Sequence, residues 1–381
     1  MSQVPAGQVP QISRTGGKTL ADTGARRYFE AAVKYEASDL LLRAGQSPRL
    51  RVKGSLKALD AKPLKLEEFE KWIEEATTPE QWEIYSTSGS LDLGFDLHTE
   101  DKGSHRFRVN IFRTRGRSAL AARRVDNKIL SFEELNLPPS MSEVCMQPAG
   151  IVLLAGVTGS GKSTTIASML QYVNERRNVH VVTIEDPIEF LFSDAKAMIN
   201  QREVGIDVVS FADGLRALVR ENPDIVLIGE MRDRTTFESA LQAAETGHLV
   251  FGTIHASSAS QAFGRIYDLF SPDERDNIRN MLAFQFQAFI YQKLLPTLLP
   301  DIPRVPAVEI LLQSPVTRKY ILDEREHELT DVIRESREQG MQTFSDSLVE
   351  LVHKQYIHPR VAHDAAMNPE ELKMRLKGIE H

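Results

Sequence analysis

The clearest chemical signature in the chain runs from residue 151 to residue 164, where the sequence reads IVLLAGVTGSGKST. Gly156, Gly161, Lys162 and Ser163 fit the pattern G-x-x-x-x-G-K-[ST], in which glycines allow backbone N–H groups to close around phosphate oxygens. Lys162 is long enough to reach the β- and γ-phosphates, Ser163 can offer its hydroxyl to Mg²⁺, and the following helix points its positive end at the anion. The apolar run before the loop and the amphipathic segment after it favour a strand, a phosphate loop and a helix over an incidental glycine-rich turn.

Three further apolar runs also end in polar residues. HVVTIED ends in Glu185 and Asp186, DIVLIGE ends in Glu230, and HLVFGTIH ends in His255. Continuous apolar runs of this kind are typical of a parallel sheet that is covered on both faces. Ligands of such sheets bind outside the carboxyl ends of the strands, so we expect all four endings at one edge, which would be the active site.

Phosphoryl transfer to water requires a metal on the β- and γ-oxygens, a group that orients the water, and positive charge on the equatorial oxygens. Glu230 is the predicted acidic partner of Mg²⁺, because it ends its strand while Asp224 begins the same strand. Glu185 or Asp186 could polarise the attacking water. The alternative for Asp186 is a turn cap before Pro187, and the sequence separates the two carboxylates only weakly.

Two histidines bracket the strand LVFGTI, one at each end, so the pair cannot form one metal site. His255 lies at the predicted catalytic edge and could sense the γ-phosphate. His248 is as well explained by a structural or interface role as by a ligand role.

Arginines are in surplus in the first part of the chain. A neighbouring domain or subunit could supply guanidinium charge to the nucleotide as an arginine finger, although a solvated strand face explains any single arginine equally simply.

The composition is that of an ordinary globular protein, with 41% hydrophobic and 26% charged residues among 381. A net charge of −7 disfavours binding to nucleic acid, and the single cysteine, Cys145, excludes both a disulfide within the chain and a four-cysteine zinc site. No apolar run is long enough to span a bilayer and the amino terminus lacks a signal sequence, so we expect a cytoplasmic protein.

The elements that must position these residues divide into five segments. We expect a flexible tail over residues 1–24, an α+β domain over 25–130, a linker over 131–148 with a hinge near Pro138, an α/β core with a parallel-rich sheet over 149–300, and a mainly helical region over 301–381. Within the core, a single helix is predicted from ERDNIRNMLAFQFQAFIYQKLLP, with Met281, Phe284, Ala288 and Tyr291 on one face.

The motifs GVTGSGKST, TIEDPIEF, NQREVG, DIVLIGEMRD and ETGHLVFGTIH resemble, in order and spacing, those of the type IV pilus retraction ATPases, the PilT and PilU proteins. The resemblance covers roughly residues 25 to 378, including ASDLLL near the start and GMQTFSDSL near the end. It implies a PAS-like first domain, a RecA-like ATPase domain, a homohexameric ring and Mg-ATP hydrolysis.

By position, the resemblance implies a role for each motif residue. Glu185 would activate water, Glu230 would be the Walker B glutamate, His255 would belong to the catalytic set, and Arg108 and Arg123 would present guanidinium groups to ATP. Nucleotide binding is implied for Gly156, Thr158, Gly159, Ser160, Gly161, Lys162, Ser163, Thr164 and His248, and metal binding for Ser163 and Glu230.

The sequence departs from the family pattern in three places. Leu41 stands where a histidine is usual, Val157 stands where PilT commonly has proline, and VTRKYILD occupies Val316 to Asp323 where PilT has a retraction-associated segment. The last departure favours PilU or a divergent PilT-like branch.

The partners implied by the resemblance are an inner-membrane pilus platform protein and, as an open possibility, a paralogous retraction ATPase. The resemblance also implies that the protein is peripheral at the inner-membrane face. The alternatives are an accessory subunit of a partner motor, a pilus assembly or secretion ATPase, and a DNA motor, the last disfavoured by the acidic charge.

Overall fold

The computed structural model describes residues 18–52, 54–99, 103–125, 128–218 and 220–378. The chain forms two compact units, of which the first ends at Asn127 and the second begins at Lys128. Among the described residues, no helix has both the length and the apolar character needed to cross a membrane.

The first unit is an antiparallel sheet with helices packed on one face. The sheet has the order β3-β2-β1-β6-β5-β4. Its elements are η1 (Leu20–Asp22), α1 (Arg26–Lys34), β1 (Asp39–Arg43), β2 (Arg49–Val52), β3 (Ser55–Ala58), α2 (Leu66–Glu75), α3 (Pro79–Ser88), β4 (Ser90–Thr99), β5 (Gly103–Thr114) and β6 (Arg117–Arg124). Phe29 of α1 and Phe69 of α2 are buried against the inward-facing Leu40 and Phe107 of the strands. The alternation of apolar and polar residues along β5 therefore predicted a half-buried strand correctly.

The predicted flexible tail is wrong at its end. Residues 1–17 of that tail lie outside the described residues, but Leu20 and Ala21 are buried in the core of the first unit. The short helix η1 begins at a capping box, in which Thr19 and Asp22 satisfy each other's backbone N–H groups. Apolar periodicity cannot identify an element of three residues, and this explains the error.

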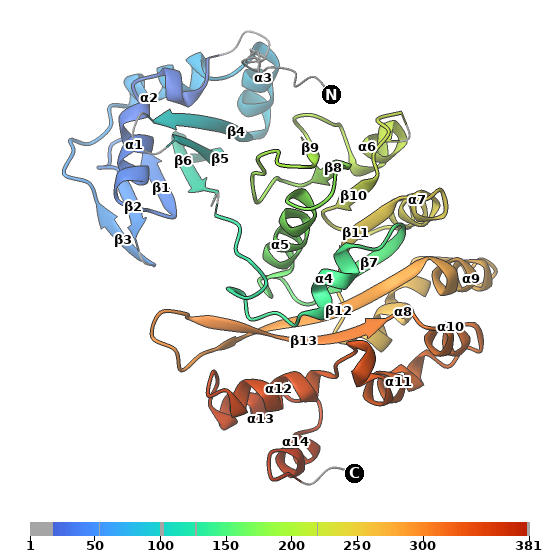
Figure 1. The fold of residues 1–381 in the computed structure, drawn as a ribbon. Helices are drawn as coiled ribbons and strands as arrows, with labels where there is room; N and C mark the ends of the chain where they lie inside the picture. The colour runs from blue at the N-terminus through green and yellow to red at the C-terminus, as the bar shows by residue number, and fades with distance from the viewer. Residues whose placement is uncertain (1–17, 53, 100–102, 126–127, 219, 379–381) are drawn as a thin grey trace, which may run out of the picture. The chain divides into compact units, whose positions relative to one another are not determined.

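The second unit is a seven-stranded sheet with helices on both faces, in the order β13-β12-β7-β11-β10-β8-β9 (Figure 1). All its described pairings are parallel except that of β12 with β13. The strands are β7 (Gly150–Ala155), β8 (His180–Glu185), β9 (Met198–Glu203), β10 (Ile225–Ile228), β11 (Leu249–Ile254), β12 (Phe286–Pro296) and β13 (Arg304–Leu312). The helices are α4 (Ser140–Cys145), α5 (Lys162–Asn174), α6 (Phe211–Leu218), α7 (Arg234–Glu245), α8 (Ala259–Tyr267), α9 (Arg275–Gln285), α10 (Pro315–Leu322), η2 (Glu326–Glu328), α11 (Leu329–Glu335), η3 (Arg337–Gln339), α12 (Phe344–His353), α13 (Pro359–Ala365) and α14 (Pro369–Arg375).

Alternate residues of each central strand enter two different cores. Val152 and Leu154 pack with α4 and α5, whereas Ile151 and Leu153 pack with the helices of the opposite face. Burial on both faces explains why these strands read as continuous apolar runs. The α/β class predicted from those runs is confirmed.

The predicted linker over 131–148 is wrong. Phe132, Leu137, Met141 and Val144 are buried in the same core as α5, so this segment is part of the second unit. The boundary between the units falls instead at residues 127 and 128. Pro138 and Pro139 precede α4, where proline is compatible with a helix start, and they do not mark a hinge between the units.

The single helix predicted before residue 296 is also wrong, because α9 ends at Gln285 and β12 begins at Phe286. Ala288 and Tyr291 lie on this strand, paired with Val152 and Ala155 of β7. A strand buried on both faces shows no alternation, so its apolar residues can also be arranged on a helical face. The boundary proposed at residue 300 consequently separates β12 from β13, which are paired from Ala288 to Pro296 and from Arg304 to Leu312.

Candidate functional site

One cavity brings together most of the predicted site. It has a volume of about 630 Å³ and is lined by residues 158–164 of the phosphate loop together with Glu185, Glu230 and His255. The loop follows β7, Glu185 ends β8, and Glu230 and His255 follow β10 and β11, so the carboxyl ends of four parallel strands supply the site. The volume is in the range of small-molecule sites.

The phosphate loop is shaped by glycines and closed by the start of α5. Gly161 has a φ of 88°, and a Cβ atom added there would lie 2.8 Å from Nε2 of Gln292. Lys162 Nζ donates to the carbonyl oxygens of Gly156, at 2.8 Å, and Val157, at 3.3 Å. Burial lowers the pKa of the Lys162 ammonium, while the charge of Glu230 opposes this. The loop thus offers backbone N–H groups, a helix N-terminus and a lysine to an anion.

Glu230 is held between two basic side chains. Arg232 donates a hydrogen bond to its Oε2, and His255 Nε2 lies 2.8 Å from its Oε1. The hydrogen bond from Arg232 lowers the pKa of Glu230, with a further contribution from His255. Glu230 is therefore ionised at neutral pH, and His255 contacts the carboxylate that faces the phosphate loop.

A magnesium ion fits the donor set of this cavity. Hydroxyl and ionised carboxylate oxygens, as in Ser163 and Glu230, are ligands that Mg²⁺ prefers, and it usually completes its shell with water and substrate phosphates. Within the described part of the chain no group of three or more His, Cys, Asp or Glu side chains could hold a metal by itself. A metal that needs phosphate oxygens as ligands agrees with the oxygen donors of the cavity and with the lack of a complete protein metal site among the described residues.

Glu185 is buried and fixed in orientation at the end of β8. Thr183 Oγ1 donates to its Oε1 at 2.6 Å, and Gln201 Nε2 donates to the same oxygen at 3.2 Å. Burial raises the pKa of Glu185, although both hydrogen bonds oppose this. A carboxylate with a raised pKa is a stronger base, so the structure favours Glu185 as a proton acceptor at the cavity wall. Asp186 lines the same cavity.

His248 does not share the site, so its prediction as a nucleotide-binding residue is not supported within this chain. Its Nδ1 lies 2.8 Å from the carbonyl oxygen of Ala243, at the amino end of β11. The strand between His248 and His255 is about 20 Å long at the usual rise per residue. Asp224 likewise lies at the amino end of its strand, where its carboxylate accepts a hydrogen bond from the backbone N–H of His180.

Arg108 and Arg123 lie in the first unit, at directly opposed positions of β5 and β6. Arg123 Nε is 3.0 Å from Asp39 Oδ1, and Arg51 Nε is 3.3 Å from Asp39 Oδ2. Paired positions on four neighbouring strands therefore form a row across the sheet, which contains three arginines and one aspartate in the order Arg51, Asp39, Arg123 and Arg108. Like charges at opposed positions destabilise a sheet, which is consistent with a requirement for an anion at this face. Their action on the nucleotide stays a prediction.

The polar residues of the cavity and its supports that the sequence did not indicate include Gln201, Arg232, Gln292 and Arg304. Arg232 could have been found, because it lies two residues after Glu230 in the motif DIVLIGEMRD. Gln201 lies in the motif NQREVG, but its contact with Glu185 depends on β9 lying beside β8. No local signal marks Gln292, because its contact depends on β12 lying beside β7.

Comparisons with known proteins agree with this geometry. The family model described as type II/IV secretion system protein matches residues 27–361. The chain is 38% identical to the type IV pilus retraction ATPase PilT of Pseudomonas aeruginosa, over 89% of this chain and 97% of that protein. It is 33% identical to the type IV pilus ATPase PilU of the same organism, over 91% and 89%, so these identities do not favour the PilU branch. A crystal structure of the pilus retraction motor PilT with bound ADP superposes with a TM-score of 0.83 at 38% identity, covering 93% of this chain and 99% of that one.

Proposed function

Because the chain belongs to the type II/IV secretion system protein family, among the type IV pilus retraction ATPases, we propose that it hydrolyses Mg-ATP in this cavity to power pilus retraction. The observation that carries the proposal is the convergence of the phosphate loop, Glu185 and Glu230 in one cavity. PilT, the relative with the similar structure, is described as a retraction motor with bound ADP.

Each residue in the proposed mechanism acts through a contact that it already makes or through its place in the cavity. The phosphate loop and Lys162 hold the β- and γ-phosphates, and the Lys162 ammonium leaves its two carbonyl partners to do so. Ser163 and Glu230 would hold Mg²⁺, and the ion would supply positive charge to the phosphate oxygens. Thr158, Gly159, Ser160 and Thr164 complete the lining around the phosphates.

Glu185 takes the proton of the attacking water. The water oxygen forms a bond to the γ-phosphorus, the bond from that phosphorus to the β–γ bridging oxygen breaks, and the products are ADP and phosphate. Loss of the γ-phosphate alters the surroundings of Glu230, and this alteration reaches His255 through its contact with the Glu230 carboxylate. Arg108 and Arg123 supply guanidinium charge to the transferring phosphoryl group from the first unit of the same or a neighbouring subunit.

At the level of the assembly, we infer a homohexamer that works on an inner-membrane platform protein, from the cytoplasmic face. An accessory role beside a paralogous retraction ATPase is the second candidate, since the segment Val316 to Asp323 departs from the PilT pattern. Turnover by the chain alone distinguishes the two, because an accessory subunit requires little hydrolysis of its own.

The test compares Lys162→Ala with Glu230→Gln in the full chain. Lys162→Ala should weaken ADP and ATP binding, because it removes the cation of the phosphate loop. Glu230→Gln should retain nucleotide binding within a few-fold and lose hydrolysis by about 10²-fold or more, because it removes the charge that holds the metal. Calorimetric titration and phosphate release measure the two properties. Hydrolysis by Glu230→Gln at the rate of the unaltered protein would remove Glu230 from the mechanism.

A further inference from the structure

We propose that Gln292 is a positioning residue of the phosphate loop, which holds one peptide group of the loop so that its N–H is directed at the nucleotide. The proposal rests on the nucleotide-binding function inferred above. Gln292 lies on β12 and is 2% exposed. Its Nε2 donates to the carbonyl oxygen of Ser160 at 2.8 Å, and its Oε1 accepts from Thr165 Oγ1 at 2.8 Å.

The first contact fixes the direction of a peptide plane. In a planar trans peptide the carbonyl oxygen and the amide N–H point in opposite directions. Because the Ser160 oxygen points at Gln292, the N–H of Gly161 points away from Gln292, on the side where Gly161 lines the cavity. A glycine with a φ of 88° has few steric barriers of its own, so a neighbouring side chain must select this orientation.

The second contact ties the same amide to the first turn of α5. Thr165 is buried, and its hydroxyl donates to Oε1 of Gln292. The Ser160 carbonyl can only accept, so it selects the amide orientation in which the NH₂ group faces it, and the Thr165 hydroxyl then satisfies the amide oxygen. The backbone of the same strand also lies close to the start of the loop, since a Cβ atom at Gly156 would lie 2.4 Å from the backbone carbonyl oxygen of Gln292. The strand β12 thus contacts the phosphate loop at its start and at its centre, and it also contacts the helix that follows the loop.

The experiment replaces Gln292 with methionine, which has similar length and no hydrogen-bonding amide. Gln287→Met is the matched control, because Gln287 lies on the same strand but beside Gly150, at the far end of β7. Calorimetry with Mg-ADP and thermal unfolding without nucleotide are measured for both variants in the full chain. We expect the Kd for ADP to rise about tenfold or more in Gln292→Met and to change less than twofold in Gln287→Met, because a buried carbonyl loses its partner. An unchanged Kd in Gln292→Met overturns the proposal.

Two conservative replacements separate positioning from folding. Thr165→Ser keeps the hydroxyl and should retain the ADP affinity, whereas Thr165→Val removes it and should weaken binding several-fold. Gln292→Glu regains a donor only when its carboxyl is protonated, so its ADP affinity relative to the unaltered protein should recover as the pH falls. Equal affinities of the two Thr165 variants, or a flat pH profile for Gln292→Glu with weakened binding, would overturn the proposal and leave a purely structural role. A lack of ADP binding by the unaltered protein would instead contradict the proposed function itself.

Discussion

At the scale of single residues, the protonation of Glu185 is the step that the site controls most directly. Burial raises the pKa of this carboxyl, and Thr183 donates the hydrogen bond that opposes the rise most strongly. Glu185 accepts a proton only in its ionised form, so activity should fall as the pH drops through this pKa. The acidic limb of the pH–rate profile should therefore lie above the range of an ordinary glutamate.

Thr183→Val tests this assignment with a side chain of the same shape. The variant loses the donor to the Glu185 carboxylate, so the pKa of Glu185 should rise further and the acidic limb of kcat should move to higher pH. Asn200→Leu is a suitable control, because Asn200 lies on neighbouring β9 but contacts His180 and not Glu185. The measurement is kcat against pH at saturating Mg-ATP. An acidic limb at the same pH in Thr183→Val and the unaltered protein would show that another group sets it.

The sequence was most informative for residues whose spacing alone carries a mechanism. Lys162 and Ser163 belong to a pattern that only a phosphate loop requires, and Glu185 and Glu230 were found because each ends an apolar run. Gln292 was not found, because a glutamine on a strand becomes significant only when the neighbour of that strand is known. The pairing of β12 with β7 creates this contact, and it joins segments more than 100 residues apart.

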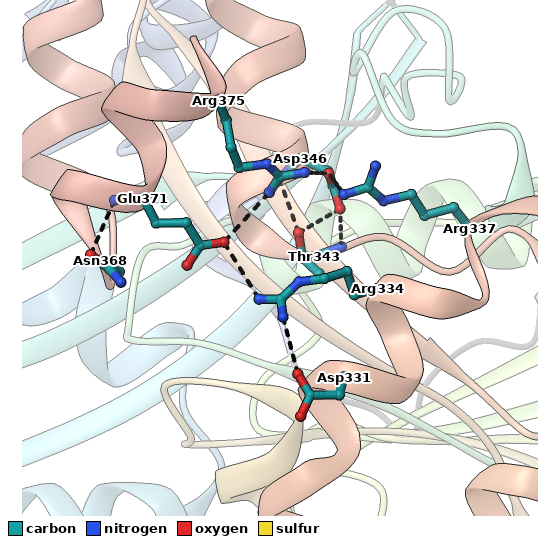
Figure 2. A network of polar contacts seen from close by, with 8 residues as sticks. All are labelled: Asp331, Arg334, Arg337, Thr343, Asp346, Asn368, Glu371 and Arg375. Atoms are coloured by element: carbon teal, nitrogen blue, oxygen red, sulfur yellow. Dashed lines mark hydrogen bonds and ion pairs between the residues drawn. The ribbon is translucent and has the colours of Figure 1, made fainter. Parts of the chain in front are cut away.

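At the scale of elements, the carboxyl-terminal helices are joined by ion pairs around Asp346 of α12 (Figure 2). Arg375 of α14 donates to its Oδ1, Arg337 Nη2 lies 2.8 Å from the same oxygen, and the backbone N–H of Thr343 donates to Oδ2 at 3.0 Å. The side chains of Arg375 and Asp346 are only 11% and 18% exposed. The carboxylate therefore serves both as a helix cap and as the counterion of a largely buried arginine.

Asp346→Asn should lower the free energy of unfolding by about 1–3 kcal/mol, because it leaves the Arg375 charge without its main partner. The control is Asp331→Asn, whose carboxylate pairs with Arg334 but is 65% exposed and should contribute less than about 0.5 kcal/mol. Denaturant unfolding measures both values, and hydrogen exchange over α14 locates the effect. Similar losses in the two variants would show that Asp346 is no more than a surface ion pair.

Helices and strands were predicted well where the spacing of their apolar residues was unambiguous, and poorly where burial on both faces removed that spacing. Apolar and polar residues alternate along the half-exposed strand β5. The central strands that precede the site are bounded by polar residues at both ends. The strand β12 is buried on both faces and continues directly from α9, so no turn residue marks the change at Phe286. Pro138 and Pro139 suggest a linker before β7, although the apolar residues of this segment fill the core beneath α5.

At the scale of the whole molecule, each of the two units carries its own group of charged side chains. The cavity of the second unit is lined by the carboxylates of Glu185 and Glu230 and by the cations of Lys162, Arg232 and Arg304. The sheet of the first unit presents Arg51, Arg123 and Arg108 in one row with Asp39. The sequence identified the arginines but could not show that Arg108 and Arg123 are opposed, because the register of a hairpin is not encoded by composition. Their pairing supports a common target, for which the γ-phosphate is our candidate.

If that target lies on a neighbouring subunit, two inactive variants should restore activity when they are mixed. Arg123→Ala should lower kcat by about 10³-fold or more, since a guanidinium group that stabilises transferring phosphoryl charge contributes this much. Lys162→Ala inactivates the phosphate loop of its own chain but retains the arginines. In a mixed ring, an intact phosphate loop of one chain can therefore lie beside an intact Arg123 of another chain. Arg51→Ala is the control, because Arg51 shares Asp39 with Arg123 but is not one of the implied fingers, and it should retain most of the activity. ATPase activity is titrated across mixing ratios in rings shown by mass measurement to contain both chains. Activity that stays at the level of the separate variants at every ratio would exclude a finger supplied in trans and assign Arg123 to its own chain.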